Sequence, residues 1–472
     1  MFCMTSQVRV HAFGDDALAD HDAVEIADLI RRGDLSTAEV EAAAIERIQK
    51  VAPTLRAVVH EAYDRPRRSS DTSAPLFGVP TLIKDNTDVA AWPTNNGSEA
   101  YTAGPAKRDG RYTRQFVGTG VSVLGKTRMP EFGLNATTEF RTQEPTVNPW
   151  NTDYSVGASS GGAAALVAAG AVPIAHANDG GGSIRIPAAA AGLIGLKPSR
   201  GRHIDGEEAR IMPINMISEG IVSRSVRDTA AFVDAMERRW RNPSLAPIGL
   251  VEGPARRRLR IGLLLESVTD AVVDDQTRAA VEHTAQLLEK QGHTVEVVPV
   301  PADPSFADDF VNYWGLLAQM AGGLGKFAFD KSFDASKLDG LTEGLRTHFK
   351  RGGWKQMPGA LRRLKKSAVT YGAAFDQVEV VVSPVVANTT PRLGQLSPNV
   401  PFDQLITRLR NHVAFTPLQN ITGTPAISLP VGLSDEGLPI GVQLSAAYGD
   451  DRTLLELAFA LEDEIGWPRI QG

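Results

Sequence analysis

Apolar residues along this chain recur at helical spacing in some segments and form short continuous runs in others. Residues 22–50 predict two helices, the first ending at Gly33 and the second beginning with a capping box at 36–39. The run GVPTLIK at 78–84 predicts a buried strand that ends in a lysine. The run at 161–170 is rich in alanine and has almost no polar face, so it predicts a buried helix.

The C-terminal half alternates between strand and helix. Residues 259–300 predict a β-α-β unit, and residues 301–375 are mainly helical. Further strands are predicted at 378–382 and within 424–442, followed by a helix at 453–464. Because no repeat, low-complexity segment or long linker divides the chain, we expect one large α/β domain.

Composition restricts the function classes. The 472 residues carry a formal net charge of −6, with 42% hydrophobic and 22% charged residues, which is ordinary for a soluble globular protein and argues against a surface that coats nucleic acid. The basic clusters at 256–258 and 362–366 are interpreted as solvated faces. Cys3 is the only cysteine, so no internal disulfide can form, and no apolar run approaches the ~20 residues of a membrane helix. We expect a cytoplasmic protein without nucleic-acid or membrane partners.

Two motif matches are weakened by their context. Residues 157–161 fit G-x-S-x-G, but a nucleophile elbow needs a strand directly before the serine, and NPWNTDY at 148–154 predicts a loop. An elbow also needs a downstream histidine, and nothing in the sequence around His412 singles it out for that role. Residues 120–127 fit the P-loop pattern, yet their segment VSVL predicts a strand rather than a phosphate-binding loop.

A run of three glycines offers a better candidate site. Gly180, Gly181 and Gly182 let the backbone approach a ligand closely and point successive amides at one spot, where an oxyanion could bind. Ser183 follows directly and could attack a carbonyl, although such a run also serves simply to turn a chain.

Lys84 is the candidate base for that serine. At the end of a buried strand its ammonium would be partly desolvated, which lowers the pKa of a lysine and frees a neutral amine. The alternative is a surface lysine at a strand end. Ser159 and Ser160 supply hydroxyls that could relay a proton between Lys84 and a second serine.

These residues resemble the amidase signature family. The resemblance rests on GVPTLIK at 78–84 and on GASSGGAAALVAAGAVPIAHANDGGGSIRIPAAAAGLIGLKPSRGR at 157–202, where Ser183 follows Ser159 by 24 residues. Supporting segments are LGKTRMPEFG, NPWN, VVSPV, NITGTPAISLPVG and GLPIGVQL. The resemblance runs from about residue 25 to the C-terminus and also explains the P-loop match as an ordinary strand and turn.

The resemblance implies roles for individual residues. Ser183 would be the nucleophile, Ser159 a bridging serine preceded by a cis peptide bond from Ala158, and Lys84 the base that starts the proton relay. The other implied roles are oxyanion-hole amides at Gly180, Gly181, Gly182 and Ser183, loop support by Asp179 and Arg185, and a Ser160 hydroxyl that bonds Lys84 or caps the following helix. The relay requires no cofactor and no metal.

The implied fold is a single large amidase signature domain of the α/β class, with a mixed, twisted central β-sheet covered by helices on both faces. It would span 21–472 after an N-terminal extension at 1–20, with a catalytic core at about 60–240 and a substrate-pocket region at about 300–420. The implied reaction is hydrolysis of the C–N bond of an amide through an acyl-enzyme on Ser183.

The implied substrate is apolar. HANDGGGSIRIPA at 176–188 is similar to an actinobacterial subgroup that includes 6-aminohexanoate-cyclic-dimer hydrolases, aryl-amide hydrolases and urethanase-like enzymes. We expect a small to medium apolar or aromatic amide or carbamate, with anilides, urethanes and nylon-type oligomers included and esterase side activity. The segments 203–220 and 308–323 are expected to shape the pocket. Phe310, Tyr313, Trp314 and Met320 are candidates for its apolar wall, the alternative being a helix core.

The chain departs from the family at three positions near the triad. Ala158 stands where the family usually has glycine, Asn178 where many relatives have threonine, and Gly180 where a larger residue is common. None of these changes removes the triad. A different class of protein stays open, the glutaminase subunit of a tRNA amidotransferase. That subunit usually carries tyrosine- and arginine-rich segments in its C-terminal half, and we do not see them in this sequence. A homodimer also stays open.

Overall fold

Eight strands form the main sheet of the computed structural model, which describes residues 9–269 and 271–471 and so leaves Cys3 outside the described residues. They lie in the order β11-β10-β12-β14-β13-β8-β9-β7. Strand β10 pairs in parallel with β11 and β12, and the other neighbours are antiparallel. The strand bounds are Ile174–Asp179 (β7), Ile194–Lys197 (β8), Ser218–Ser223 (β9), Arg260–Leu263 (β10), Thr294–Val297 (β11), Val380–Pro384 (β12), Ala426–Leu433 (β13) and Pro439–Ala446 (β14). The mixed sheet and the predicted β-α-β unit are confirmed.

A smaller sheet lies beside strand β7 of the main sheet. Its strands are Val58–Glu61 (β1), Arg67–Arg68 (β2), Pro80–Lys84 (β3) and Ser122–Thr127 (β4). Side chains connect β3 to β7: the Thr81 hydroxyl donates to the Ile174 carbonyl (2.9 Å), and the Lys84 backbone N–H donates to His176 Nδ1 (3.1 Å). This junction places the end of β3 next to β7. Strand β4 also confirms that 120–127 is not a P-loop.

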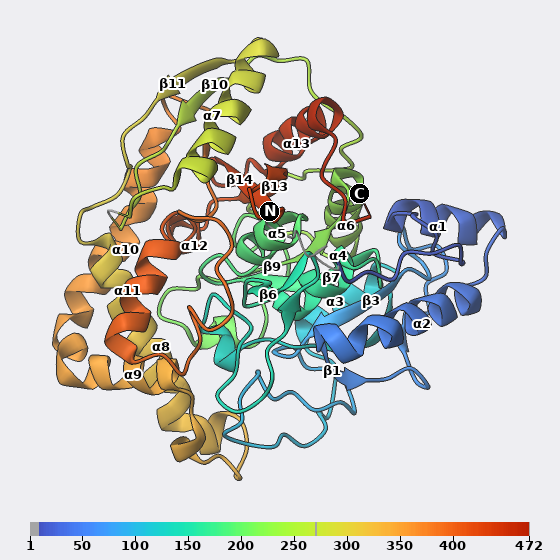
Figure 1. Ribbon diagram of the computed structural model, residues 1–472, viewed down its shortest axis with the longest axis horizontal. Coiled ribbons are helices and arrows are strands. Elements are labelled where there is room, and N and C mark those ends of the chain that lie inside the picture. Colours follow the sequence, from blue (N-terminus) through green and yellow to red (C-terminus); the bar gives the residue numbers. More distant parts are fainter. Residues whose placement is uncertain (1–8, 270, 472) are drawn as a thin grey trace, which may run out of the picture.

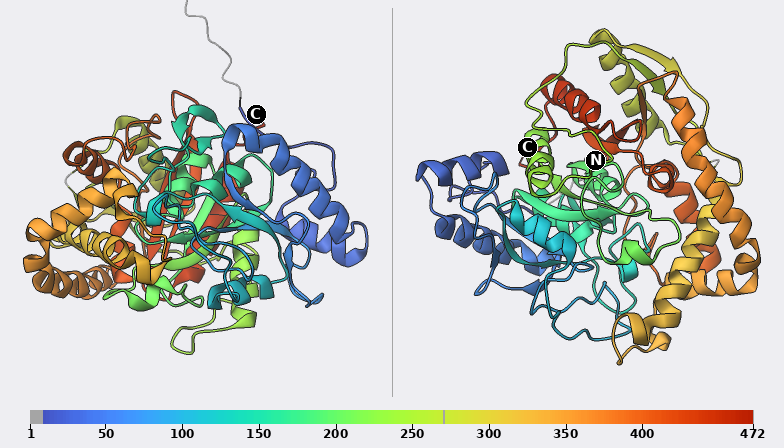
Figure 2. Two further views of the ribbon diagram at one scale, coloured as in Figure 1. Left: turned by 90° about the horizontal axis from the view of Figure 1, so that it is seen from below. Right: turned by 180° about the vertical axis from the view of Figure 1, so that it is seen from behind.

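Helices enclose the two sheets and form two distant ends of the molecule. Helices α1 and α2 lie at one end and α8 to α11 at the other, as Figure 1 and the view from behind in Figure 2 show. The helix bounds are Ala23–Arg32 (α1), Thr37–Leu55 (α2), Arg111–Gly118 (α3), Gly161–Ala168 (α4), Arg185–Ala191 (α5), Val226–Arg239 (α6), Asp275–Lys290 (α7), Phe306–Ala328 (α8), Gly340–His348 (α9), Trp354–Ala374 (α10), Phe402–His412 (α11), Pro417–Thr422 (α12) and Asp451–Ile465 (α13). Gly33 caps α1 in the left-handed conformation and the capping box opens α2, both as predicted, but α2 continues past residue 50.

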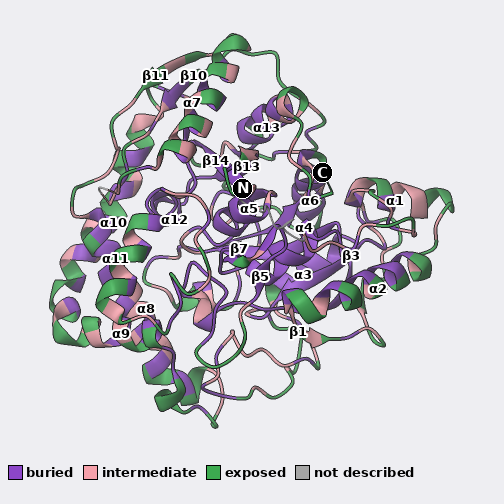
Figure 3. Cartoon of the chain, in the orientation of Figure 1, coloured by how far each residue is buried: buried purple, intermediate pink, exposed green. Residues whose placement is uncertain are grey.

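Helices α4 and α5 form the buried centre of the fold. Every residue of both helices is buried, which confirms the prediction for α4 and is visible as purple ribbon in Figure 3. Glycines in the sheet admit α5 at close range, since a Cβ at Gly195 would lie 2.7 Å from the Ala188 side chain and one at Gly441 would lie 2.4 Å from that of Ala189. The close approach fixes α5, and with it the serine loop just before it, against the sheet.

The segment NPWNTDY forms a hairpin, not the predicted loop. Strands β5 (Val147–Asn148) and β6 (Asn151–Ser155) make a separate two-stranded sheet. The Asn148 side chain closes it by donating to the Ser155 carbonyl (3.0 Å). Before the first helix, the backbone N–H of Val10 donates to the Pro149 carbonyl (2.8 Å), while the boundary of the N-terminal extension stays a prediction. Across the described ranges, no helix is both long and apolar enough to cross a membrane.

Candidate active site

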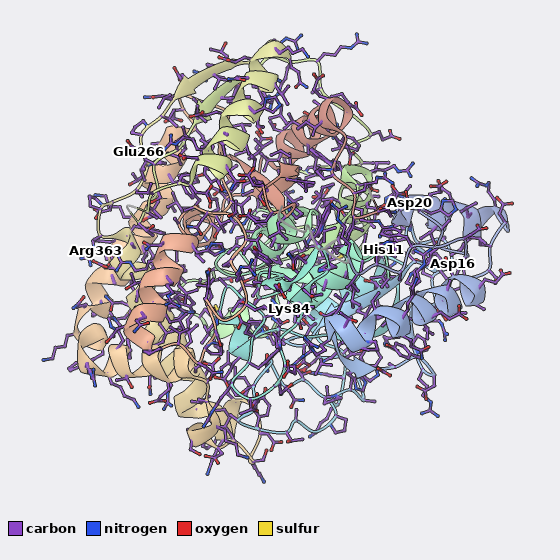
Figure 4. All side chains as sticks on the ribbon, in the orientation of Figure 1. His11, Asp16, Asp20, Lys84, Glu266 and Arg363 are labelled. Carbon is purple, nitrogen blue, oxygen red and sulfur yellow. The ribbon has the colours of Figure 1, made fainter. Side chains whose placement is uncertain are left out.

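A cavity of about 920 Å³ lies beside the glycine loop, and Lys84, Ser159 and Ser183 all line it. The three residues come from different elements: the last residue of β3, the turn before α4 and the turn before α5. Lys84 lies near the middle of the molecule, between its two helical ends (Figure 4). The fold therefore brings the three predicted residues to one buried place.

Lys84 meets Ser159 directly. Its Nζ lies 2.7 Å from Ser159 Oγ and 2.6 Å from Asn178 Oδ1, and the lysine side chain is fully buried. Burial lowers the pKa of Lys84 to about 7, against the opposing charges of Glu219, Glu208 and Asp179. A pKa of about 7 leaves much of the lysine amine neutral near pH 7, which agrees with the desolvation expected for a lysine at the end of a buried strand.

Ser159 follows a cis peptide bond from Ala158, as the resemblance implies. The structure corrects the roles predicted for Ser160, whose hydroxyl donates to the Asn178 carbonyl (3.3 Å). Helix α4 begins without a side-chain cap hydrogen bond, so Ser160 neither caps it nor bonds Lys84. The second contact of the lysine is Asn178 instead.

The glycine loop splits into two parts. Gly180, Gly181 and Ser183 line the cavity, whereas the backbone N–H of Gly182 donates to Asp179 Oδ1 (2.7 Å). This hydrogen bond corrects the prediction that Gly182 contributes an oxyanion donor. Gly182 has φ 131°, and a Cβ there would lie 2.4 Å from the hydroxyl oxygen of Thr416, so only glycine fits.

Asp179 and Arg185 hold the loop, as predicted. Arg185 donates from Nε to Asp179 Oδ2 and from Nη2 to Oδ1, both at 2.9 Å, and both side chains are fully buried. Burial alone would raise the pKa of Asp179, but the adjacent Arg185 outweighs it and keeps that pKa well below its usual range. The Asp179 carboxylate is therefore ionised at neutral pH, and two hydrogen bonds from Arg185 fix its geometry.

Helix α12 supplies further support that sequence reasoning missed. Asn420 donates to the backbone and side-chain oxygens of Asp179 (both 2.8 Å), and the Thr416 hydroxyl donates to the Gly181 carbonyl (2.6 Å). Asn420 lies within the quoted segment NITGTPAISLPVG, which carried the resemblance without indicating a role. These contacts hold the backbone carbonyls of Asp179 and Gly181, next to the part of the loop that lines the cavity.

A buried acidic cluster behind Lys84 was also missed. Glu219 lies opposite Asn178 across β9 and β7, and its Oε2 is 2.9 Å from His176 Nε2. Glu208 is the first residue of the 3₁₀ turn at Glu208–Ile211, and its Oε1 accepts a hydrogen bond from the Asn178 side chain (3.4 Å). Burial raises the pKa of both glutamates, and the charge of Glu219 raises that of Glu208 further. The proximity comes from strand register and a 3₁₀ turn, which the sequence pattern does not reveal.

One wall of the cavity is apolar. Phe310, Trp314 and Met320 of α8 line it, as predicted, and a Cβ at Gly181 would lie 3.6 Å from the Phe310 ring. Tyr313 is a correction: it is fully buried, and its hydroxyl donates to the Ile214 carbonyl (2.7 Å) and accepts from the Ile214 N–H (3.0 Å). The predicted pocket segment 203–220 also contributes lining residues, namely Gly206, Glu207, Glu208, Ile211, Met212, Met216 and Ile217.

The elbow hypothesis gains no support from the geometry. The strand before Ser159 is β6, which belongs to the two-stranded hairpin and not to the main sheet. His412 lies at the end of α11 with its Nδ1 2.6 Å from Asn388 Oδ1. The group that contacts Ser159 is Lys84.

Comparison with known proteins agrees with this geometry. The family model Amidase matches residues 39–455. A protein named "Putative amidase AmiC" from Mycobacterium leprae (strain TN) is 49% identical over 469 residues, covering 98% of this chain and 99% of the relative. A 6-aminohexanoate-cyclic-dimer hydrolase of Pseudomonas sp. (strain NK87) is 33% identical over 487 residues, covering 94% of this chain and 95% of the relative.

Solved structures share the whole fold. That of 6-aminohexanoate cyclic dimer hydrolase has a TM-score of 0.85 at 28% identity, covering 97% of this chain and 99% of the other. A glutamyl-tRNA(Gln) amidotransferase subunit from Thermotoga maritima has a TM-score of 0.77 at 23% identity, covering 96% of each chain, and that likeness shows the fold alone. The family match and the 49% identical relative show that this chain belongs to the amidase signature family of hydrolases, which cleave the C–N bond of amides.

Proposed function

We propose that this chain hydrolyses small to medium apolar or aromatic amides through an acyl-enzyme on Ser183. The observation that carries the proposal is the 2.7 Å contact between the buried Lys84 amine and the Ser159 hydroxyl, at a cavity that Ser183 also lines. A lysine with a pKa of about 7 can take a proton at neutral pH.

The proposed reaction begins with a proton relay. Neutral Lys84 takes a proton from the Ser159 hydroxyl, and Ser159 in turn takes one from Ser183 as its oxygen attacks the amide carbon. The negative charge that develops on the carbonyl oxygen meets the backbone amides of Gly181 and Ser183 and that of Gly180 at the cavity wall. The peptides that carry the Gly180 and Ser183 amides are held before the reaction, because their carbonyls accept from the Asn420 side chain (2.8 Å) and from the Ile186 N–H (2.7 Å).

Collapse of the tetrahedral intermediate breaks the C–N bond. The relay returns its proton to the leaving amine through Ser159, and the acyl group stays as an ester on Ser183. A water molecule then gives its proton to the same relay and hydrolyses the ester, which frees the acid and restores the serine.

The apolar wall supports the substrate class. Phe310, Trp314 and Met320 present rings and a thioether to the cavity, which matches an aromatic or aliphatic acyl or amine group. The relative named 6-aminohexanoate-cyclic-dimer hydrolase extends the candidates to cyclic and nylon-type amides. Anilides and carbamates are proposed on the same grounds.

A substrate panel tests the proposal. The kcat/KM of purified protein is measured for anilides, carbamates, cyclic and linear aliphatic amides, esters, and the primary amides of amino acids. We expect turnover of the apolar and aromatic members and none in Ser183→Ala. Turnover confined to primary amides of amino acids would contradict the substrate class, and an active Ser183→Ala protein would contradict the mechanism.

A further inference from the structure

The Asn178 side chain joins Lys84 to the acidic cluster behind it. Its Oδ1 lies 2.6 Å from Lys84 Nζ, and its Nδ2 donates to Glu208 Oε1 at 3.4 Å. Asn178 also lines the cavity.

The orientation of this carboxamide decides where the lone pair of Lys84 points. A neutral amine has two N–H donors and one lone pair. When Asn178 presents its oxygen, an N–H of Lys84 occupies it and the lone pair is free to face the Ser159 hydroxyl at 2.7 Å. When Asn178 presents its –NH₂ group instead, that group donates to the lone pair and competes with Ser159.

Glu208 selects the productive orientation. Its Oε1 accepts from Asn178 Nδ2 and also from Asn86 Nδ2 (3.0 Å), so it acts as an acceptor and draws the –NH₂ end of Asn178 away from Lys84. Its other oxygen lies in the same region as Glu219, because Glu208 Oε2 and Glu219 Oε1 each lie 2.8 Å from the point where a Cβ of Gly206 would stand, and the charge of Glu219 raises the pKa of Glu208. A proton on Glu208 Oε2, which burial and the charge of Glu219 favour, leaves Oε1 as an acceptor.

His176 closes the far side of the cluster. Its Nδ1 accepts the backbone N–H of Lys84, so the ring proton is on Nε2, which lies 2.9 Å from Glu219 Oε2. The groups that face the lysine amine are thus Asn178, Glu208 and Glu219, with Asp179 on the loop side and the neutral His176 ring on β7.

We infer that Asn178 and Glu208 are positioning residues that aim the Lys84 lone pair at Ser159, with Glu208 acting through the orientation of the Asn178 carboxamide. The inference rests on the proposed function, in which Lys84 is the base. It adds two residues to the relay and explains why an acid lies buried behind a base.

A double-mutant cycle tests the inference. Full-length protein is labelled with a fluorophosphonate, and the limiting first-order rate of Ser183 modification is measured from pH 5.5 to 9.5, together with the Kd of the reversible complex. Comparing plateau rates at high pH, where Lys84 is neutral in every variant, separates positioning from protonation. Asn178→Leu and Glu208→Leu keep bulk and remove the hydrogen-bonding groups.

We expect each single variant to lower the plateau rate by about tenfold, as the loss of orientation at one proton-transfer step predicts, with little change in Kd. Glu208→Gln should retain most of the plateau rate, because Asn86 holds the amide oxygen of the new glutamine toward Asn178. The double variant should be no slower than Asn178→Leu alone, since Glu208 acts only through Asn178.

Three results would overturn the inference: losses that multiply in the double variant, a Glu208→Leu plateau equal to that of wild type, or a Glu208→Gln protein as slow as Glu208→Leu. Thermal unfolding shows whether each variant folds, and Glu208→Ala replaces Glu208→Leu in the cycle if the latter does not. If Ser183 of the wild type is not labelled, the proposed function is overturned and the inference with it. If Ser183 is labelled but all variants share the wild-type plateau rate, the inference alone is overturned.

Discussion

Two buried ionisable residues flank the serines, and burial acts on them in opposite ways. Asp179 on the glycine-loop side is paired with Arg185, and its pKa stays well below the usual range although burial opposes this. Among the residues that the structure describes, none with a permanent charge lies within hydrogen-bond reach of Lys84 on the other side, and burial lowers the pKa of Lys84 to about 7. On the glycine-loop side, Asp179 stays charged and fixes the geometry of the loop. On the other side, Lys84 can lose its charge and accept a proton near neutral pH.

The difference lies in the partner rather than in the depth of burial. A guanidinium stays protonated at any accessible pH and therefore stabilises the carboxylate beside it. Glu208 and Glu219 near Lys84 are themselves buried, which raises their pKa values, and their charges oppose the lowering of the lysine pKa without outweighing burial. The same low dielectric thus surrounds a fixed ion pair at Asp179 and an amine at Lys84 that titrates near neutral pH.

A third buried residue shows that burial alone does not make a base. Lys197 is also fully buried with a pKa lowered to about 7, first by burial and next by the charge of Arg185. Its Nζ donates to the Pro198 carbonyl (3.0 Å) and the Ser218 hydroxyl (3.3 Å) and does not contact Ser159. Placement at a reactive hydroxyl separates Lys84 from Lys197.

The largest effect is expected when the titratable amine of Lys84 is removed. Lys84→Met keeps the bulk of the side chain and removes the amine, so kcat for an anilide should fall by about a thousandfold. Lys197→Met is the matched control, expected to change the midpoint of thermal unfolding but to leave kcat close to that of wild type. Equal losses of kcat in the two variants would mean that Lys84 acts through stability.

The next largest effect is expected when the fixed Asp179–Arg185 ion pair is broken. Asp179→Asn leaves the Arg185 charge buried without its counter-ion, so the free energy of unfolding should fall by about 3–5 kcal/mol in urea titrations. Because the folded-state pKa of Asp179 is depressed, its stabilisation is present above the unfolded-state pKa and is lost only as pH falls through the folded value. The deficit of the variant should therefore be the same at pH 7 and pH 5.

An exposed pair provides the control for that experiment. Glu282→Gln removes a carboxylate 3.8 Å from Arg278, with both side chains more than 40% exposed, and should change stability by less than about 1 kcal/mol. A deficit in Asp179→Asn no larger than that of Glu282→Gln would contradict the contrast between the two sides.

The pH profile sharpens the comparison. Lys84 acts as a base only when neutral, and its pKa of about 7 means that the protonated form dominates below that pH. The kcat/KM should rise with pH, by about tenfold per unit well below pH 7, and level off above it. A rise centred near pH 10 would indicate an ordinary exposed lysine, and a flat profile down to pH 5 would exclude Lys84 as the base.

The smallest effect concerns the apolar wall. Trp314→Ala removes a ring that lines the cavity, so the ratio of kcat/KM for an anilide to that for a short aliphatic amide should fall by about tenfold. Tyr313→Phe removes a hydroxyl that bonds Ile214 and should lower stability by about 1 kcal/mol without changing the ratio. A shift of the ratio in Tyr313→Phe would put that residue in the pocket after all.

Local patterns predicted the parts of the site that a single segment encodes. The buried strand ending at Lys84, the helix after Ser159 and the glycine turn before Ser183 each carry their own signal, and the segments themselves resemble one family. The amides and hydroxyls that these segments provide could be predicted without knowing which distant segments contact them. The fold class followed in the same way from alternating strands and helices.

Contacts between distant segments could not be predicted. Glu219 reaches Asn178 only because β9 pairs with β7 in one register, and Glu208 reaches it only because a 3₁₀ turn folds over the junction. Likewise, Tyr313 leaves the cavity wall because the segment at Ile214 covers it, although its helix also carries Phe310 and Trp314. A pattern of residue types shows neither the register nor the covering segment.

The measurement that tests the central claim most directly is peptide mapping by mass spectrometry after fluorophosphonate labelling, with wild type and Lys84→Met side by side. The account predicts an adduct on Ser183 in the wild type at neutral pH, formed far more slowly in the variant. An adduct on Ser159, or equal rates of Ser183 labelling in the two proteins, would contradict the Lys84–Ser159–Ser183 relay.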